Sequence, residues 1–260
     1  MRIATWNVNS LRTRIARVEA FLDRHDIDVL ALQETKAKVD QLPTMGLQAR
    51  GYEVAAAGHS QWNGVALVSR VGLADVQVGF EGMPPYGDPE HAEARVISGV
   101  CGGVRVVSLY VPNGRKPQDP HYVYKLDWLA RLREASQAWL GDPAALVGDW
   151  NICPTDEDVF DVTQFRNSTH VTPPERAAFQ AMLDAGWREV SRAHAPGYTY
   201  WDYYRQRFER DRGLKIDFVL ASPALAERVT GAFIDRDERD PSVFPGAPSD
   251  HAPVVVDLAD

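Results

Sequence analysis

Residues 3–34, IATWNVNSLRTRIARVEAFLDRHDIDVLALQE, decide the fold class. The stretch begins with a short apolar run at residues 3–6, which predicts a strand. An amphipathic helix follows, with Ser10 at its N-cap position. Its apolar residues recur near the 3.6-residue period and so share one face: Leu11, Ile15, Val18 and Leu22. A compact apolar run at residues 28–32 predicts a second, buried strand. The chain therefore opens with a β-α-β unit, which favours a mixed α/β fold.

Further strand-like runs are spread over the rest of the chain, at residues 65–68, 94–100, 104–111, 144–147, 216–221 and 253–258. Cys101-Gly102-Gly103 separates two of them and predicts a hairpin. Helices are predicted over residues 122–140 and after Thr172-Pro173-Pro174-Glu175, a capping-box start. Many strands lie too close in sequence for a helix between them, which favours two packed sheets with outer helices over a doubly wound sheet. No linker divides the chain, so residues 1–260 are predicted to form a single domain.

The composition is that of a globular protein. Hydrophobic residues make up 45% and charged residues 25% of the chain. No apolar run approaches the roughly 20 residues that a membrane span needs, and the N-terminus lacks the pattern of a secretory signal. The two cysteines, Cys101 and Cys153, are too few for a disulfide framework. We therefore expect a cytoplasmic protein without a membrane partner.

The net charge of −8 argues mildly against a nucleic-acid partner, because binding to a phosphate backbone needs positive charge. An acidic cluster that holds a metal ion would weaken this argument, because the bound cation cancels its charge. Basic residues also gather in one stretch: Arg205, Arg207, Arg210, Arg212 and Lys215. This stretch is either a solvated surface or a contact for phosphate groups.

Polar residues lie at or near the ends of the predicted strands: Asn7, Glu34, Tyr110, Asp149, Asn151, Asp217, Asp250 and His251. Proteins of the α/β class commonly place their sites at strand ends. Each residue also has an ordinary alternative as a turn residue, a helix cap or a structural histidine. Asp217 is the hardest to explain in this way, because it lies inside an apolar run. A carboxylate buried there is costly unless it is paired or bound to a metal.

The chemistry of this set is that of an oxygen-ligated cation site. Carboxylates and amides, without a candidate cysteine nucleophile, suit Mg²⁺ or alternatively Mn²⁺ rather than Zn²⁺. Phosphodiester hydrolysis needs a cation on the phosphoryl oxygens, a group that activates water and stabilisation of the leaving oxygen. The set offers all three. The Walker, Gly-x-Ser-x-Gly and His-Glu-x-x-His motifs of other enzyme classes are absent.

Six motifs occur in chain order: WNVNSLR (6–12), LQETK (32–36), YVPNG (110–114), GDWN (148–151), RGLKID (212–217) and SDHAP (249–253). Together they resemble the exonuclease III family of AP endonucleases, within the wider group of endonuclease/exonuclease/phosphatase enzymes. The resemblance runs from residue 3 to near the C-terminus. It implies a four-layer α-β-β-α sandwich with two central mixed sheets. It also implies Mg²⁺-dependent cleavage of DNA 5′ to abasic sites, which leaves a 3′-hydroxyl, and 3′-to-5′ exonuclease or 3′-end trimming activity.

The resemblance implies a metal site around Glu34, the principal ligand, with Asn7 beside it. The remaining candidate ligands are Asp149, Asn151, Asp250 and His251.

The resemblance also implies catalytic roles. Asp149 orients and deprotonates the attacking water, which Asn151 helps to place. His251, oriented by Asp217, binds the scissile phosphate, and Tyr110 contacts the phosphate or assists the leaving oxygen. A carboxylate partner makes a histidine more readily cationic, which suits a phosphate site. The resemblance leaves open whether Asp149 or His251 is the general base.

Thr199-Tyr200-Trp201 resembles the aromatic segment that lies near the abasic pocket in this family. Trp201 would cover the apolar face of an extrahelical sugar, and intact nucleotides would be excluded by size. The alternative is a core tryptophan in a strand. The other candidates for DNA contact are Thr199, Arg95, Arg205, Arg212 and Lys215.

The leading prediction is a monomeric nuclease that acts on double-stranded DNA with abasic sites or blocked 3′ ends. The second is a phosphodiesterase or phosphatase of the same superfamily, acting on RNA, a nucleotide or a phospholipid head group. The third is a non-enzymatic DNA-binding or scaffold protein on the same fold. The complete set of candidate catalytic residues argues against the third.

Overall fold

The predicted β-α-β unit opens the structure, a computed structural model that describes residues 1–259. Strand β1 (Arg2–Asn7) and strand β2 (Val29–Gln33) pair in parallel on either side of helix α1 (Leu11–His25) in the sequence. Ser10 occupies the N-cap position of α1, as predicted. Its side chain makes no capping hydrogen bond, because its hydroxyl meets that of Thr13 at 3.0 Å.

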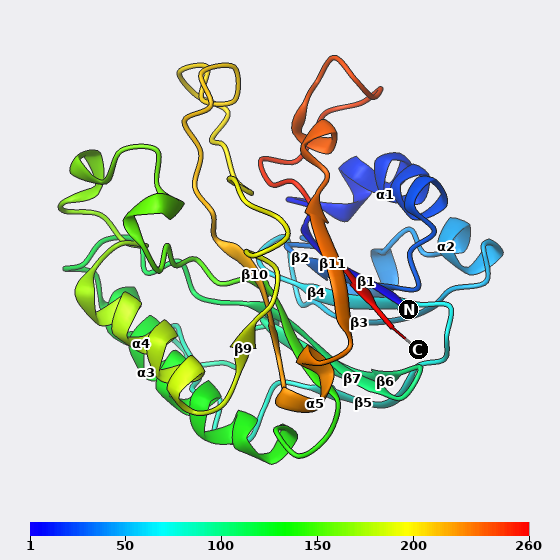
Figure 1. Cartoon of the computed structure of the whole chain (residues 1–260), viewed down its shortest axis with the longest axis horizontal. Coiled ribbons are helices and arrows are strands. Elements are labelled where there is room, and N and C mark those ends of the chain that lie inside the picture. Colours follow the sequence, from blue (N-terminus) through cyan, green and yellow to red (C-terminus); the bar gives the residue numbers. More distant parts are fainter. Residues whose placement is uncertain (260) are drawn as a thin grey trace.

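Within the described residues, the strands form two mixed sheets of six (Figure 1). The first has the order β11-β12-β1-β2-β4-β3, and the second has the order β5-β6-β7-β8-β10-β9. The remaining strands of the first sheet are β3 (Glu53–Ala57), β4 (Val65–Ser69), β11 (Val229–Ile234) and β12 (Val254–Leu258). The strands of the second sheet are β5 (Ala74–Val78), β6 (Val96–Cys101), β7 (Val104–Tyr110), β8 (Ala144–Asp149), β9 (Arg188–Glu189) and β10 (Asp217–Ala221).

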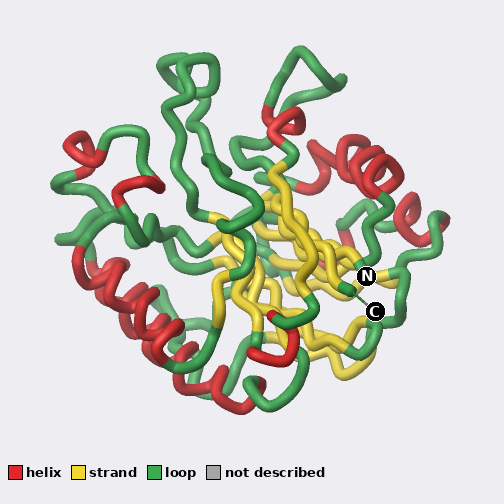
Figure 2. The backbone as a smooth tube through the Cα atoms, viewed as in Figure 1, coloured by secondary structure: helices red, strands yellow, loops and turns green. Residues whose placement is uncertain are grey.

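Helices cover the outer face of each sheet, so the predicted four-layer α-β-β-α sandwich is confirmed (Figure 2). Helix α1 and the short α2 (Met45–Ala49) lie on the first sheet, while α3 (Pro120–Ser136) and α4 (Pro173–Asp184) lie on the second. A third apolar cluster fills the space between the sheets. The remaining helical segments are α5 (Pro223–Ala226) and the 3-10 turns Val39–Gln41, Gln137–Trp139, Asp156–Asp158, Val162–Phe165 and Arg236–Arg239.

Most predicted elements are present within a few residues of their predicted bounds. The hairpin around Gly102 joins β6 to β7, and the capping box of Thr172 and Glu175 starts α4. The strands that were not predicted are β3, β5, β9 and β11, which are the edge strands of the two sheets. Within residues 1–259, no helix has both the length and the apolar character needed to cross a bilayer.

The strand directions bring the candidate site residues to one edge of the sandwich. The parallel pairs β1–β2 and β7–β8 end there, and β10 and β12, which run antiparallel to them, begin there. The register places Asp149 opposite both Tyr110 and Asp217. The long loops before β10 and before β12 rise above this edge (Figure 1).

Candidate active site

Three groups from separate chain segments converge where the ends of the two sheets meet. Glu34 follows β2, Asp149 ends β8 and His251 precedes β12, and their ligand atoms all lie within 4.8 Å of one another. Asn7, the last residue of β1, links the two carboxylates. Its Nδ2 donates to Glu34 Oε1 at 2.8 Å and to Asp149 Oδ2 at 3.0 Å. The structure thus brings four of the predicted site residues into one cluster.

Glu34 is held in place by its backbone and by a neighbouring lysine. Its φ of 52° lies in the left-handed region, which is unusual for a residue other than glycine. Lys36 Nζ lies 2.7 Å from Glu34 Oε2. Burial alone would raise the pKa of Glu34, but Lys36 and Asn7 outweigh it, and the pKa lies below its usual value. Glu34 is therefore ionised at neutral pH. Sequence reasoning missed this ion pair, although Lys36 follows Glu34 by only two residues.

The pKa of Asp149 is shifted in the opposite direction from that of Glu34. Burial raises its pKa to about 7, and the charges of Asp217 and Glu34 act in the same direction. Its Oδ1 accepts from the backbone N–H of Asn151 at 2.9 Å, which leaves Oδ2 facing Asn7 and His251. A carboxylate with this pKa can take up a proton near neutral pH.

His251 is a buried cation held by Asp217. Burial alone would lower its pKa, but the charges of Asp217 and Asp149 raise it to about 10. Nδ1 donates to Asp217 Oδ2 at 2.9 Å, and Nε2 lies 3.8 Å from Asp149 Oδ2. The partnership predicted for Asp217 is therefore present. Thr199 donates to the same Asp217 oxygen at 2.6 Å and is fully buried. Its hydroxyl is therefore engaged with Asp217 and is not available in this structure for the DNA contact that was predicted.

The donor set fits a divalent cation. The carboxylate oxygens of Glu34 and Asp149 are hard ligands of the kind that Mg²⁺ and Mn²⁺ prefer, and Asn7 Nδ2 holds both carboxylates in place. The raised pKa of Asp149, caused partly by the charge of Glu34, shows that the two carboxylates repel each other. A bound cation would relieve this repulsion.

Residues 4–251 match the model of the Endonuclease/Exonuclease/phosphatase family. The chain belongs to this family. It is 30% identical to the exodeoxyribonuclease III of Haemophilus influenzae, with 98% of each chain covered. Two solved structures match over 100% of both chains: a 3′ phosphatase from Neisseria bound to a product DNA hairpin (35% identity, TM-score 0.92) and an AP endonuclease from Archaeoglobus fulgidus (33% identity, TM-score 0.91). The predicted family is confirmed, and the protein is a hydrolytic nuclease.

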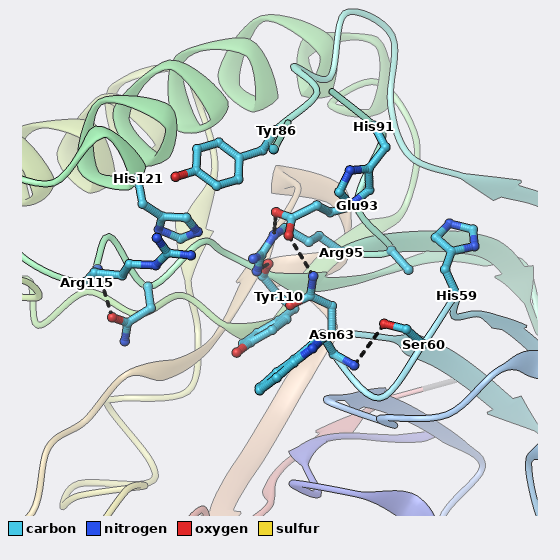
Figure 3. A pocket seen from close by; sticks show the side chains of 14 residues that line it. His59, Ser60, Asn63, Tyr86, His91, Glu93, Arg95, Tyr110, Arg115 and His121 are labelled. Carbon is cyan, nitrogen blue, oxygen red and sulfur yellow. Dashed lines mark hydrogen bonds and ion pairs between the residues drawn. The ribbon is translucent and has the colours of Figure 1, made fainter. Parts of the chain in front are cut away.

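Tyr110 of this nuclease ends β7 beside the cluster, and the side chain of Arg95 lies against it (Figure 3). The Arg95 guanidinium lies 4.9 Å from the Tyr110 ring and is paired with Glu93 at 2.6 Å. Burial raises the pKa of Tyr110 well above its usual value, so its hydroxyl remains a hydrogen-bond donor. Arg95 is only 4% exposed. It therefore supports Tyr110 and also lines the larger cavity beside the cluster, and its contact with DNA stays a prediction.

Two other predicted ligands of the nuclease lie at the margin of the cluster. The amide of Asn151 is bonded on both sides, because Oδ1 accepts from Asn113 at 3.1 Å and Nδ2 donates to the carbonyl of Val111 at 3.0 Å. Asp250 accepts from Asn9 at 3.1 Å and lies outside the converging group. Asn113 belongs to a recognised sequence motif, yet sequence reasoning assigned it no role.

Two predicted DNA contacts of the nuclease are buried. The Trp201 side chain is 1% exposed, because the loop that follows folds back and packs Phe208 against it at 5.3 Å. Lys215 is 2% exposed and donates to the carbonyl of Ala195 at 3.0 Å. Neither side chain is therefore available for a DNA contact in this structure, whereas Arg205 and Arg212 are exposed, as a phosphate contact requires.

Two cavities flank the catalytic cluster of the nuclease. The larger, of about 530 Å³, extends from Tyr110 towards Tyr86 and Trp62 (Figure 3). The smaller has a volume of about 280 Å³. Its lining combines aromatic, apolar and basic side chains: Phe160, Phe165, Tyr200, Leu214, His170, Arg207 and Arg212. Asn113 and Arg115 line both cavities, so the two are adjoining parts of one cleft.

Proposed function

We propose that this nuclease is a Mg²⁺-dependent phosphodiesterase that cuts double-stranded DNA 5′ to abasic sites, leaves a 3′-hydroxyl and trims blocked 3′ ends. The observation that carries the proposal is the convergence of Glu34, Asp149 and His251, whose ligand atoms lie within 4.8 Å of one another, with the pKa of Glu34 lowered and that of His251 raised to about 10. This arrangement brings together a base, a cation site and a side chain that can bind a phosphate group. The 3′ phosphatase bound to DNA and the AP endonuclease among its structural relatives support DNA as the substrate.

The chain's own residues supply most of the chemistry. Mg²⁺ held by Glu34 and Asp149, with Asn7 beside them, would neutralise charge on the phosphoryl oxygens. Asp149, whose Oδ2 faces Asn7 and His251, accepts the proton of the attacking water. His251 has no free lone pair once it is protonated, so it donates from Nε2 to a phosphoryl oxygen instead. Tyr110 donates its hydroxyl towards the phosphate or the leaving oxygen.

The flanks of the cleft suit a DNA strand. The smaller cavity has apolar walls at Phe160, Phe165 and Leu214, which suit a sugar that has lost its base. Arg207 and Arg212 stand at the same cavity and can contact neighbouring phosphates. This role replaces the one predicted for Trp201, whose neighbour Tyr200 lines the cavity instead.

Cleavage of two end-labelled duplexes tests the proposal, one with a central abasic-site analogue and one with a 3′-phosphate at a nick. Each is incubated with Mg²⁺ or with chelator, using the wild type, Asp149→Asn and, as a matched control, Asp127→Asn at an exposed position of α3. We expect Mg²⁺-dependent incision 5′ to the analogue and removal of the 3′-phosphate, both lost in Asp149→Asn and retained in the control. Activity on the nicked duplex alone would remove the abasic-site part of the proposal. A folded wild type that cuts neither duplex would overturn it and would direct the search to RNA and phospholipid head groups.

A further inference from the structure

Lys125 on helix α3 lies beneath the catalytic cleft without any exposed side-chain surface. Its ammonium donates to the carbonyl of Asn151 at 2.7 Å and to the carbonyl of Asn113 at 3.3 Å. The side chains of these two asparagines also bond to each other at 3.1 Å. One buried cation therefore holds the backbone of both loops at the centre of the cleft.

The carbonyl of Asn151 needs this support because of the conformation of its residue. Asn151 has a φ of 50°, in the left-handed region, which persists only where the surroundings fix it. The same carbonyl accepts a second hydrogen bond from His170 Nδ1 at 2.6 Å. The backbone N–H of Asn151 in turn donates to Asp149 Oδ1 at 2.9 Å. The conformation of Asn151 thus determines the direction in which the Asp149 carboxylate points.

Glu175 completes the arrangement from helix α4. Its Oε1 lies 2.5 Å from Lys125 Nζ and also accepts from the backbone N–H of His170 at 2.9 Å. Its Oε2 accepts from the hydroxyl of Thr172 at 2.7 Å, as part of the capping box. The ion pair therefore links both outer helices of the second sheet to the loop that carries Asn151.

We propose that Lys125 is a positioning residue for hydrolysis, which holds Asn151 in its left-handed conformation and thereby aims the carboxylate of Asp149 into the cleft. The inference rests on the proposed phosphodiesterase function. Lys125 cannot touch a substrate, because no part of its side chain reaches the surface. Stability alone is a weak explanation for the pair, since desolvation offsets most of the attraction in a buried ion pair.

The test compares Lys125→Met with the double variant K125M/E175M, which leaves no unpaired charge in the interior. The matched control is Arg17→Met. Arg17 is likewise a buried cation, 4% exposed, that pairs with Glu238 and donates to backbone carbonyls, but it lies on α1 away from the cleft. Thermal unfolding is measured for each variant to verify that it is folded.

We expect kcat for incision to fall about 10- to 100-fold in both Lys125 variants with KM almost unchanged, since a supporting hydrogen-bond partner commonly has this effect. Amide hydrogen exchange of residues 148–153 should rise in the same variants and stay at the wild-type level in Arg17→Met. Wild-type kcat and wild-type exchange in both Lys125 variants would overturn the inference. A wild type that cuts no duplex would overturn the proposed function instead, while the exchange measurement would still decide whether Lys125 fixes the loop.

Discussion

Replacing Asp217 with asparagine should move the pH range in which the nuclease is active. Asp217 Oδ2 lies 2.9 Å from His251 Nδ1, and its charge is the largest influence that raises the pKa of that imidazole. In the proposed mechanism, the protonated form of His251 donates to the phosphate. Activity that depends on it is present at low pH and is lost as the pH rises through the pKa, which is about 10 in the wild type.

The size of the change follows from the geometry. An opposite charge in direct contact shifts a pKa by about 1 to 3 pH units, which corresponds to roughly 1.4 to 4 kcal/mol of interaction with the proton. Asp217→Asn should therefore move the alkaline limb of the pH–rate profile down by about 1 to 3 pH units. At pH 7 the loss of orientation should lower kcat by about 10- to 100-fold.

Two measurements check this prediction. The pH dependence of kcat is recorded on the preferred duplex, and the titration of the His251 ring is followed by NMR in metal-free protein. Thr199→Val is the matched control, because it removes the 2.6 Å hydrogen bond to Asp217 and leaves the charge in place. Thr199→Val should move the alkaline limb of the pH–rate profile much less than Asp217→Asn does. The reasoning is refuted if the limb and the ring titration of Asp217→Asn coincide with those of the wild type.

Two further predictions concern the scaffold and the DNA contact. Gly148→Ala should lower the free energy of unfolding by at least about 3 kcal/mol in urea denaturation, because a Cβ there would lie 2.0 Å from the carbonyl oxygen of Leu109. Gly141→Ala, where a Cβ would meet nothing within 4 Å, should have little effect, and equal losses would contradict the steric argument. The double variant R207A/R212A should lower the magnitude of the salt slope, log Kd against log salt, by about 2 in fluorescence anisotropy with a labelled duplex. An unchanged slope would show that neither arginine contacts phosphate.

The central strands could be predicted from the sequence, whereas the edge strands could not. Strands such as β2 and β8 are buried on both faces and read as uninterrupted apolar runs. In contrast, every side chain of β5 is exposed, and most residues of β3 and β11 are only partly buried. An edge strand pairs with a neighbour on one side only. Its own residues therefore show little of the apolar pattern that predicts a strand.

The catalytic cluster could be predicted because its members follow the recognisable central strands. Asn7, Glu34 and Asp149 each lie at the end of such a strand, so the position of the strand fixes the position of the residue. The substrate contacts depend instead on how the loops fold. Trp201 and Lys215 have side chains that suit DNA binding, but Trp201 packs against Phe208 of the loop that follows it, and Lys215 bonds to the carbonyl of Ala195. Sequence composition cannot show which face of a loop turns towards the core.

The charges of the cleft explain how an acidic chain can act on a polyanion. Four carboxylates surround the cluster, from Glu34, Asp149, Asp217 and Asp250, and all four influence the pKa values of its members. Two cations lie within 4.0 Å of these carboxylates, the ammonium of Lys36 and the imidazolium of His251. With every carboxylate ionised, two negative charges remain, and one divalent cation cancels them. Without that cation the cleft should repel a phosphate, so we expect that the same acidic residues that contribute to the net charge of −8 make substrate binding at this site depend on a metal.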